Sequence, residues 1–279
     1  MRYLHGHPKA LTLVAYLIAF VAVGAIALSW GVAGFLAAWH HLHPLLLAWV
    51  GGGALVGLFA YIVAYRALMH FDDGPRLSIP DAIRIVAHGF GPFVPAGGFD
   101  VDKRALHGLH GDSCEAGLRV FAIGAMELAV LAPAACVAAI VLLLESDVHH
   151  VDESVLWPWA VCVPVGFVVG FWLIDRARRG VDPRRAGLAG AWGRAVRGAW
   201  MLADLGRQPL DGWPALLGMG AYWAADILSF FAAARFLGVP LSVPQAIVAY
   251  ATGYALTRRS LPLGGAGVTE VLMTFALHW

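Results

Sequence analysis

Charged residues are scarce in this sequence. Aspartate, glutamate, lysine and arginine make up 13% of the chain and hydrophobic residues 60%, whereas soluble domains carry about 25% charged residues. The composition therefore excludes an ordinary soluble domain and indicates an integral membrane protein. The formal net charge of +1 gives no overall basic excess, and nucleic acid is not an expected partner.

Cysteine and organised metal ligands are also few. The three cysteines, Cys114, Cys136 and Cys162, form no C-x-x-C pair and two lie inside apolar runs, so we interpret them as small core residues. Histidines gather at 40–43 and 149–150, the latter near four acids. These ligand types allow a metal site, but short loops without fixed spacing favour loop histidines. We expect no metal and no cofactor.

The motifs of common enzyme chemistry are missing as well. The sequence has no nucleophile elbow, no phosphate-binding Gly-Lys-Ser/Thr loop and no metalloprotease helix, which argues against an ATP-driven pump and an obvious hydrolase. We do not expect an enzyme. A membrane-embedded transferase acting on lipid-linked substrates remains a weaker alternative.

Long apolar runs dominate what is present. A helix that crosses about 30 Å of hydrocarbon needs about 20 apolar residues. Five windows meet or approach that length: Leu11 to Trp39, Leu45 to Met69, Ala116 to Leu144, Trp157 to Ile174 and Trp213 to Leu237. Gly267 to Trp279 is a shorter sixth. Because the first run is about twice the length of a signal-peptide core, we expect it to remain as a spanning helix.

The fold expected from these runs is an all-α, polytopic membrane protein, with residues 1–279 as a single membrane domain. About six transmembrane helices are joined by two segments, Ser78 to Gly98 and Ser242 to Gly265, that are apolar but broken by glycine and proline. The small-residue pairs Gly53/Gly57 and Gly166/Gly170 predict close helix packing.

The distribution of charge orients the chain. The loop from Glu145 to Trp157 has four acids and no lysine or arginine, whereas the loop 176–212 contains eight arginines. By the positive-inside rule the arginine-rich loop is cytoplasmic and the acidic loop is external. Counting the spans back from that loop places the N-terminus on the cytoplasmic side of a bacterial inner membrane. It also makes Ser78 to Gly98 a re-entrant hairpin on the cytoplasmic side.

Within the arginine-rich loop, residues 185–203 have an amphipathic helical pattern. One face carries Arg194 and Arg197. The opposite face is apolar: Leu188, Trp192, Ala195, Val196, Ala199 and Trp200. This pattern is typical of a helix in the membrane interface, attracted to anionic headgroups. A helix packed on the cytoplasmic ends of the bundle fits it equally well.

The two broken segments resemble each other. SIPDAIRIVAHGF, from Ser78, and SVPQAIVAYATGY, from Ser242, agree at six of thirteen positions, and each is followed by Pro-x-Gly-Gly. Ser242 with Gln245, and more weakly Ser78 with Asp81, form capping boxes that start a helix. Three spans accompany each segment, so residues 1–145 and 155–279 form inverted repeats. This arrangement is typical of a transporter whose site lies between the repeats.

The second broken segment offers groups for an anion. The amides of Gly264, Gly265 and Gly267 open the last helix, where the helix dipole favours negative charge. Arg258 and Arg259 just before them have the geometry for phosphate oxygens. We interpret the arginine pair as a phosphate-docking patch. Arginines that snorkel to the interface, or form ion pairs with Glu270 or Asp226, are the alternative.

Two acids lie near the middles of their spans. Glu127 and Asp226 would be costly in hydrocarbon unless neutralised, so a functional role is the default hypothesis. They can pair with the arginines, bind a cationic group or carry a proton. A protonated or hydrogen-bonded structural acid is as good an interpretation for either one alone.

A family resemblance adds to this picture. LPLGGAGVTE, with Arg258 and Arg259 before it, resembles the Arg…Pro-x-Gly-Gly-x-Gly-x-x-Glu signature of the lysyl-phosphatidylglycerol synthase transmembrane-region family, a flippase-like domain. PFVPAGGFDVDKRAL resembles an earlier stretch of that family, and the order of spans agrees. The chain departs from the family at Leu128, where an arginine usually follows the acid, and it contains no soluble aminoacyl-transferase domain.

The resemblance implies a membrane lipid transporter that moves anionic or aminoacylated phospholipid, or a related polar or isoprenoid lipid, between leaflets. It implies substrate-binding roles for one of the arginine pair and for further residues: Pro262, Gly264, Gly265, Gly267, Glu270, Pro95, Gly97, Gly98 and Arg104. The alternative is a non-transporting accessory protein that binds lipid or a partner enzyme of lipid biosynthesis. The expected partners are a polar lipid and the membrane, and the oligomeric state is open, including a homo-oligomer.

Overall fold

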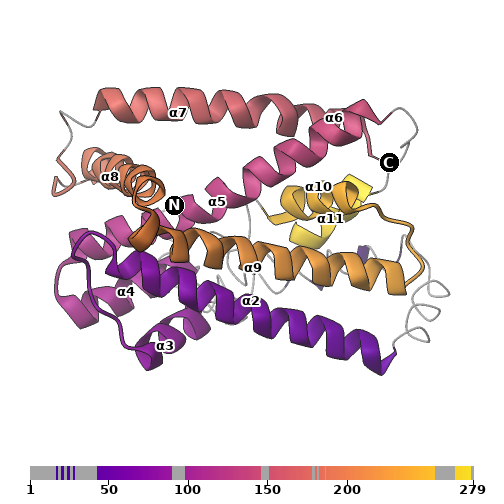
Figure 1. The fold of residues 1–279 in the computed structure, drawn as a ribbon, viewed down its shortest axis with the longest axis horizontal. Helices are drawn as coiled ribbons and strands as arrows, with labels where there is room; N and C mark the ends of the chain where they lie inside the picture. Colours follow the sequence, from indigo (N-terminus) through magenta and orange to yellow (C-terminus); the bar gives the residue numbers. More distant parts are fainter. Residues whose placement is uncertain are drawn as a thin grey trace.

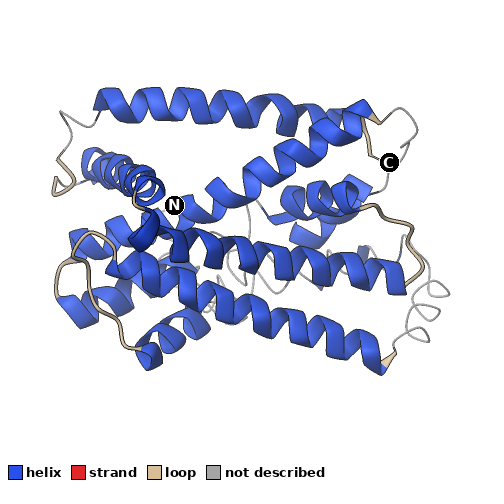
Figure 2. Ribbon diagram, in the orientation of Figure 1, coloured by secondary structure: helices blue, strands red, loops and turns tan. Residues whose placement is uncertain are grey.

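The fold is helical throughout the part of the chain that the structure, a computed structural model, describes. These residues are 43–89, 98–145, 151–177, 182–185, 187–254 and 268–277, with single positions between 17 and 28 and Gly180. No strand occurs among them (Figure 2). The elements are α2 Pro44–His70, α3 Ile79–Gly89, α4 Gly98–His110, α5 Ser113–Leu144, α6 Glu153–Trp157, the π-helical turn η2 Pro158–Cys162, α7 Val163–Ala177, α8 Gly187–Arg207, α9 Pro209–Phe236, α10 Val243–Tyr254 and α11 Val268–Leu277.

Four of these stretches are long and apolar enough to cross a membrane. They are Pro44–His70, Ser113–Leu144, Glu153–Ala177 and Asp211–Phe236, and they coincide with four of the expected windows. The first expected span, Leu11 to Trp39, lies outside the continuously described residues. The last window contains α11, whose 10 residues are shorter than a full crossing requires. The all-α class and four candidate spans are thereby confirmed.

The long helices run along one direction, with the short helices gathered at their ends (Figure 1). α2 and α9 lie side by side and antiparallel, and α5 crosses the bundle beside them. α3 and α4 lie at the end where α2 finishes and α5 begins, whereas α10 and α11 lie toward the other end. α3 and α10, the described helices of the two broken segments, therefore lie toward different ends of the bundle.

Glycines set the spacing between α2 and α9. A Cβ at Gly53 would overlap Ser229 Oγ, and one at Gly57 would lie 3.2 Å from Asp226 Oδ1. This first small-residue pair supports close packing, as expected. Gly166 and Gly170 do not, because a Cβ on either would meet no described atom within 4 Å.

The expected core position of the cysteines is partly wrong. Cys162 is exposed on η2, and Cys114 and Cys136 are only partly buried. Cys162 lies on an outward-facing stretch, since no residue of η2 or α7 is buried. An apolar run therefore indicated membrane depth here but not burial inside the protein.

The capping box of Ser242 and Gln245 forms in full, and that of Ser78 and Asp81 forms in part. Ser78 Oγ accepts the Asp81 amide at 3.3 Å and donates to Asp81 Oδ2 at 2.5 Å. Gln245 Oε1 accepts the Ser242 amide at 2.8 Å, and Ser242 Oγ accepts the Gln245 amide at 3.4 Å. α3 and α10 thus start as predicted, and α3 packs against α4 as α10 packs against α11. In both halves of the chain, the helix that begins a broken segment thus packs against the next described helix.

Arg119 fixes the end of α2 to α5. This side chain is 2% exposed, and its Nη1 donates to the carbonyl oxygens of Leu68, Met69 and Phe71 at 3.0, 3.0 and 2.9 Å. Its Nε donates to Glu115 at 2.6 Å. The last carbonyls of a helix have no partner within the helix and carry a partial negative charge. A buried cation from another helix therefore serves as the C-cap of α2.

We expect Arg119→Met to reduce the stability of the protein by roughly 2–4 kcal/mol, because each buried carbonyl left without a donor costs about 1–3 kcal/mol. Arg207→Met is the matched control. Arg207 is 66% exposed and pairs with Asp204 at 3.0 Å, and such surface pairs contribute about 0–1 kcal/mol. Thermal unfolding in detergent measures both. Equal losses in the two variants would contradict the capping role.

Candidate functional site

The two acids predicted inside the spans each accept a hydrogen bond from a tyrosine on another helix. Tyr61 of α2 donates its hydroxyl to Glu127 Oε1 of α5 at 2.6 Å. Tyr250 of α10 donates to Asp226 Oδ2 of α9 at 2.9 Å. Both carboxyl groups are partly buried. Each acid thus has a polar partner at membrane depth, which lowers the cost of placing it there.

Aromatic rings connect the two acid–tyrosine pairs. Tyr61 meets Tyr222 edge-on with centroids 5.0 Å apart, and Tyr222 lies 4.8 Å from Trp223. Trp223 is 6.0 Å from Tyr250, which stacks on Tyr254 at 4.4 Å. We call this set the tyrosine–acid cluster: Tyr61, Glu127, Tyr222, Trp223, Asp226, Tyr250 and Tyr254.

The cluster ties four helices together at the centre of the bundle. Trp223 Nε1 of α9 donates to the Glu127 carbonyl oxygen of α5 at 3.0 Å, so α9 contacts α5 as well as α2 and α10 there. Tyr61, Tyr222, Trp223 and Tyr250 are all buried. The rings cover part of each carboxyl group, and an electrostatic interaction is stronger in such a partly buried place than in bulk water.

Carboxylates beside aromatic faces are suited to cations. The face of an aromatic ring attracts an ammonium or guanidinium group, most strongly when water is excluded. A carboxylate with a tyrosine donor keeps further oxygen lone pairs for a second partner. The cluster can therefore hold a positively charged group from a ligand or from the protein itself.

The structure describes only a few of the other predicted site residues. Gly98 is the first residue of α4, and Arg104 is an exposed residue of the same helix. Glu270 belongs to α11, but its side chain is not among those described. The remaining ones lie outside the described residues: Arg258, Arg259, Pro262, Gly264, Gly265, Gly267, Pro95 and Gly97. Of the predicted set, the structure brings Glu127 and Asp226 into one cluster.

The aromatic members of the cluster were not predicted. Tyrosine and tryptophan in spans concentrate at the two membrane interfaces. Tyr61 and the Tyr222–Trp223 pair lie well inside their apolar windows, away from those belts. Their depth is the signal in the sequence that marks them as partners for buried polar groups.

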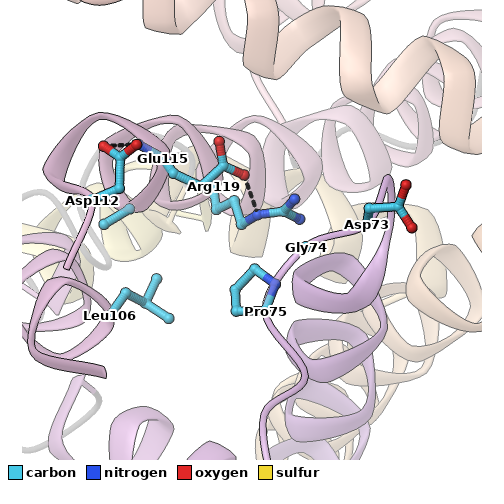
Figure 3. A pocket seen from close by; sticks show the side chains of 8 residues that line it. Asp73, Gly74, Pro75, Leu106, Asp112, Glu115 and Arg119 are labelled. Atoms are coloured by element: carbon cyan, nitrogen blue, oxygen red, sulfur yellow. Dashed lines mark hydrogen bonds and ion pairs between the residues drawn. The ribbon is translucent and has the colours of Figure 1, made fainter. Parts of the chain in front are cut away.

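A cavity of about 320 Å³ lies at the end of the bundle beside Arg119 (Figure 3). Three of its polar wall groups, Asp112, Glu115 and Arg119, bond to one another or to the backbone. Asp112 caps α5 by accepting the amides of Cys114 and Glu115 at 2.8 and 3.3 Å, which lowers the pKa of its carboxyl. Across the described residues, no three metal-ligating side chains converge. We therefore assign the wall of this cavity a structural role.

Comparisons of the chain with protein-family models, with curated proteins and with solved structures find no match.

We expect each of the two acids to be energetically coupled to the tyrosine that donates to it. In a double-mutant cycle, Tyr61→Phe with Glu127→Gln should show a coupling energy of about 1 kcal/mol, as should Tyr250→Phe with Asp226→Asn. The mixed pair Tyr61→Phe with Asp226→Asn is the control and should couple less, because no direct bond joins its members. Unfolding in detergent gives the energies. Strict additivity in both bonded pairs would show that these bonds contribute nothing to folding.

Proposed function

We propose that the protein is a bacterial inner-membrane lipid transporter that moves an anionic or aminoacylated phospholipid, or a related polar or isoprenoid lipid, between leaflets. The observation that carries the proposal is the tyrosine–acid cluster. Ionisable residues inside spans are costly and generally serve a function, and here two of them share one aromatic enclosure.

The position of the cluster supports a site between two repeats. Tyr61 and Glu127 belong to the proposed first repeat, 1–145, and Asp226 and Tyr250 to the second, 155–279. The contacts of Trp223 with Glu127 and of Tyr222 with Tyr61 cross from one to the other. Transporters with inverted repeats bind substrate at such an interface near the midplane.

The arrangement of the broken segments supports the inverted topology. α3 with α4 and α10 with α11 lie toward different ends of the long helices (Figure 1). That is the arrangement expected if each segment enters the membrane from its own side, with six spans and a cytoplasmic N-terminus. The packing of α4 on α3 and of α11 on α10 supports a re-entrant hairpin in each repeat.

In this proposal the arginine pair that holds the phosphate is close in sequence to the cluster. Arg258 is four positions after Tyr254, a member of the cluster, which limits their Cα atoms to about 14 Å apart. The arginine pair is therefore near the cluster in the chain. We propose that Arg258 and Arg259 hold the headgroup phosphate, that Glu127 and Asp226 balance its positive groups, and that rocking of the repeats exposes the site alternately.

Translocation by the purified protein in liposomes tests the function. Headgroup-labelled phosphatidylglycerol, and its aminoacylated form, should change leaflet faster than in protein-free vesicles. Glu127→Gln and Asp226→Asn should slow the movement. Lipid binding without translocation would favour the accessory-protein alternative, and a new product in the lipid extract would favour a transferase.

Arginine-to-lysine variants test phosphate docking within the same assay. Lysine keeps the charge of Arg258 and Arg259 but loses the bidentate geometry, so translocation should fall, while unfolding temperature stays near that of the parent. Gly265→Val should reduce translocation by blocking approach to the backbone. Arg207→Lys serves as the exposed control. Full activity in the double lysine variant would contradict phosphate docking by the pair.

Cysteine labelling tests the topology. With the three native cysteines replaced by alanine, Glu153→Cys should react with an impermeant thiol reagent added outside. Lys103→Cys and Arg185→Cys should react only after the membrane is opened. All three positions are exposed, so burial does not interfere. External labelling at Lys103 would mean that Ser78 to Gly98 crosses the membrane, which would rule out the inverted repeat.

A further inference from the structure

α8 packs on the bundle through a glycine-rich face. The residues of this face are Gly190, Gly193, Val196, Gly198, Met201 and Leu205. A Cβ at Gly198 would lie 2.9 Å from the ring of Phe121 in α5, and one at Gly193 would lie 2.8 Å from Pro183. α8 contacts both α5 and α9. Packing on the bundle, one of the two alternatives for this helix, is what the structure shows.

Arg194 of α8 lies against the protein, whereas Arg197 and Arg207 of the same helix are exposed. Arg194 is partly buried and donates to the Pro183 carbonyl oxygen at 3.1 Å. Arg197 lines a cavity of about 280 Å³ that Asp72, Glu115 and Asp204 also line. Of the polar face of this amphipathic helix, Arg194 is therefore used inside the protein.

Part of the apolar face points away from the bundle, whereas Val196 of the same face is buried. Leu188 is 91% exposed and Trp192, one turn further on, is 49% exposed. Ala191 beside them is exposed too. A water-facing helix normally has the reverse arrangement, with its polar face outside. The outward face of α8 thus fits an apolar medium.

Exposed arginines lie close in sequence to this apolar face. Arg184 and Arg185 immediately precede the helix, and Arg176 ends the neighbouring α7, where its guanidinium lies 5.9 Å from the Trp172 ring. In Figure 1, α8 is seen nearly end-on and lies across the direction of the long helices. If those helices cross the membrane, the axis of α8 is parallel to its surface.

We propose that α8 docks on the membrane surface, with Leu188 and Trp192 inserted at the level of the acyl chains and with Arg184 and Arg185 bound to anionic headgroups. Basic residues next to an apolar helix face are the combination that binds anionic bilayers. A second copy of the chain fits less well, because the same arginines would meet one another. The proposal needs the protein to be in a membrane but does not depend on lipid transport.

A nitroxide at position 192 tests the docking. The full-length protein carries Trp192→Cys, with Cys114, Cys136 and Cys162 replaced by alanine, in vesicles of phosphatidylcholine alone or mixed with phosphatidylglycerol. Collisions with oxygen report on the membrane interior, and collisions with a water-soluble nickel chelate report on water. Gln208→Cys, exposed just beyond α8, is the control label and should favour nickel in both vesicles.

We expect the label at 192 to favour oxygen, and more so with phosphatidylglycerol present. Arg184→Gln with Arg185→Gln should abolish the phosphatidylglycerol effect. Accessibility to nickel at 192 in both vesicles would overturn the proposal, because the face would be in water. Protection from both reagents would overturn it by showing a protein partner or a second copy. Equal oxygen accessibility of the parent label in both kinds of vesicle would show that the arginines do not bind phosphatidylglycerol, which would overturn the proposal.

Discussion

The structure depends on one buried cation, the guanidinium of Arg119, which holds the end of α2 against the first turns of α5. Three carbonyl oxygens of α2 and the loop after it converge on one nitrogen, and Glu115 accepts from another. The chain also makes room for the cation, since a Cβ at Gly74 would collide with the guanidinium. A charge buried this completely stabilises one arrangement strongly, because any shift leaves both the cation and the carbonyls without partners.

This clamp sets the register of the helices that build the candidate site. α2 and α5 run in opposite directions. Tyr61 lies eight residues before Met69, and Glu127 lies eight residues after Arg119. At 1.5 Å per residue both are about 12 Å from the clamp, measured toward the bundle centre. Equal distances bring the tyrosine hydroxyl and the carboxyl group to the same depth, where they bond at 2.6 Å. A polar contact at one end of the bundle thus positions another at its middle.

The features that could be predicted from the sequence are those that depend on neighbouring residues. The serine caps at Ser78 and Ser242, and the four long apolar helices, follow from short patterns. Glu127 and Asp226 stood out because acids are rare at membrane depth. Arg119 did not, because an arginine near a span end looks like an interfacial side chain. The tyrosines were missed because their hydroxyl partners come from other helices. For α8, the amphipathic pattern predicted a helix. Glycine carries no hydrophobic signal, so the sequence did not show that the glycine-rich face packs on the bundle.

The two halves of the tyrosine–acid cluster are held by different forces, and this difference bears on how the protein could move. Between α2 and α9, Gly53, Gly57 and Gly218 bring the backbones together, and a Cβ at Gly218 would lie 2.9 Å from the Ala60 carbonyl. Contacts of that kind resist sliding, because any shift drives backbone into side chain. α10 instead meets α9 through aromatic rings and the Tyr250–Asp226 bond, which tolerate small rotations and can re-form. Conformational change at the site is therefore easier on the α10 side than across the α2–α9 seam.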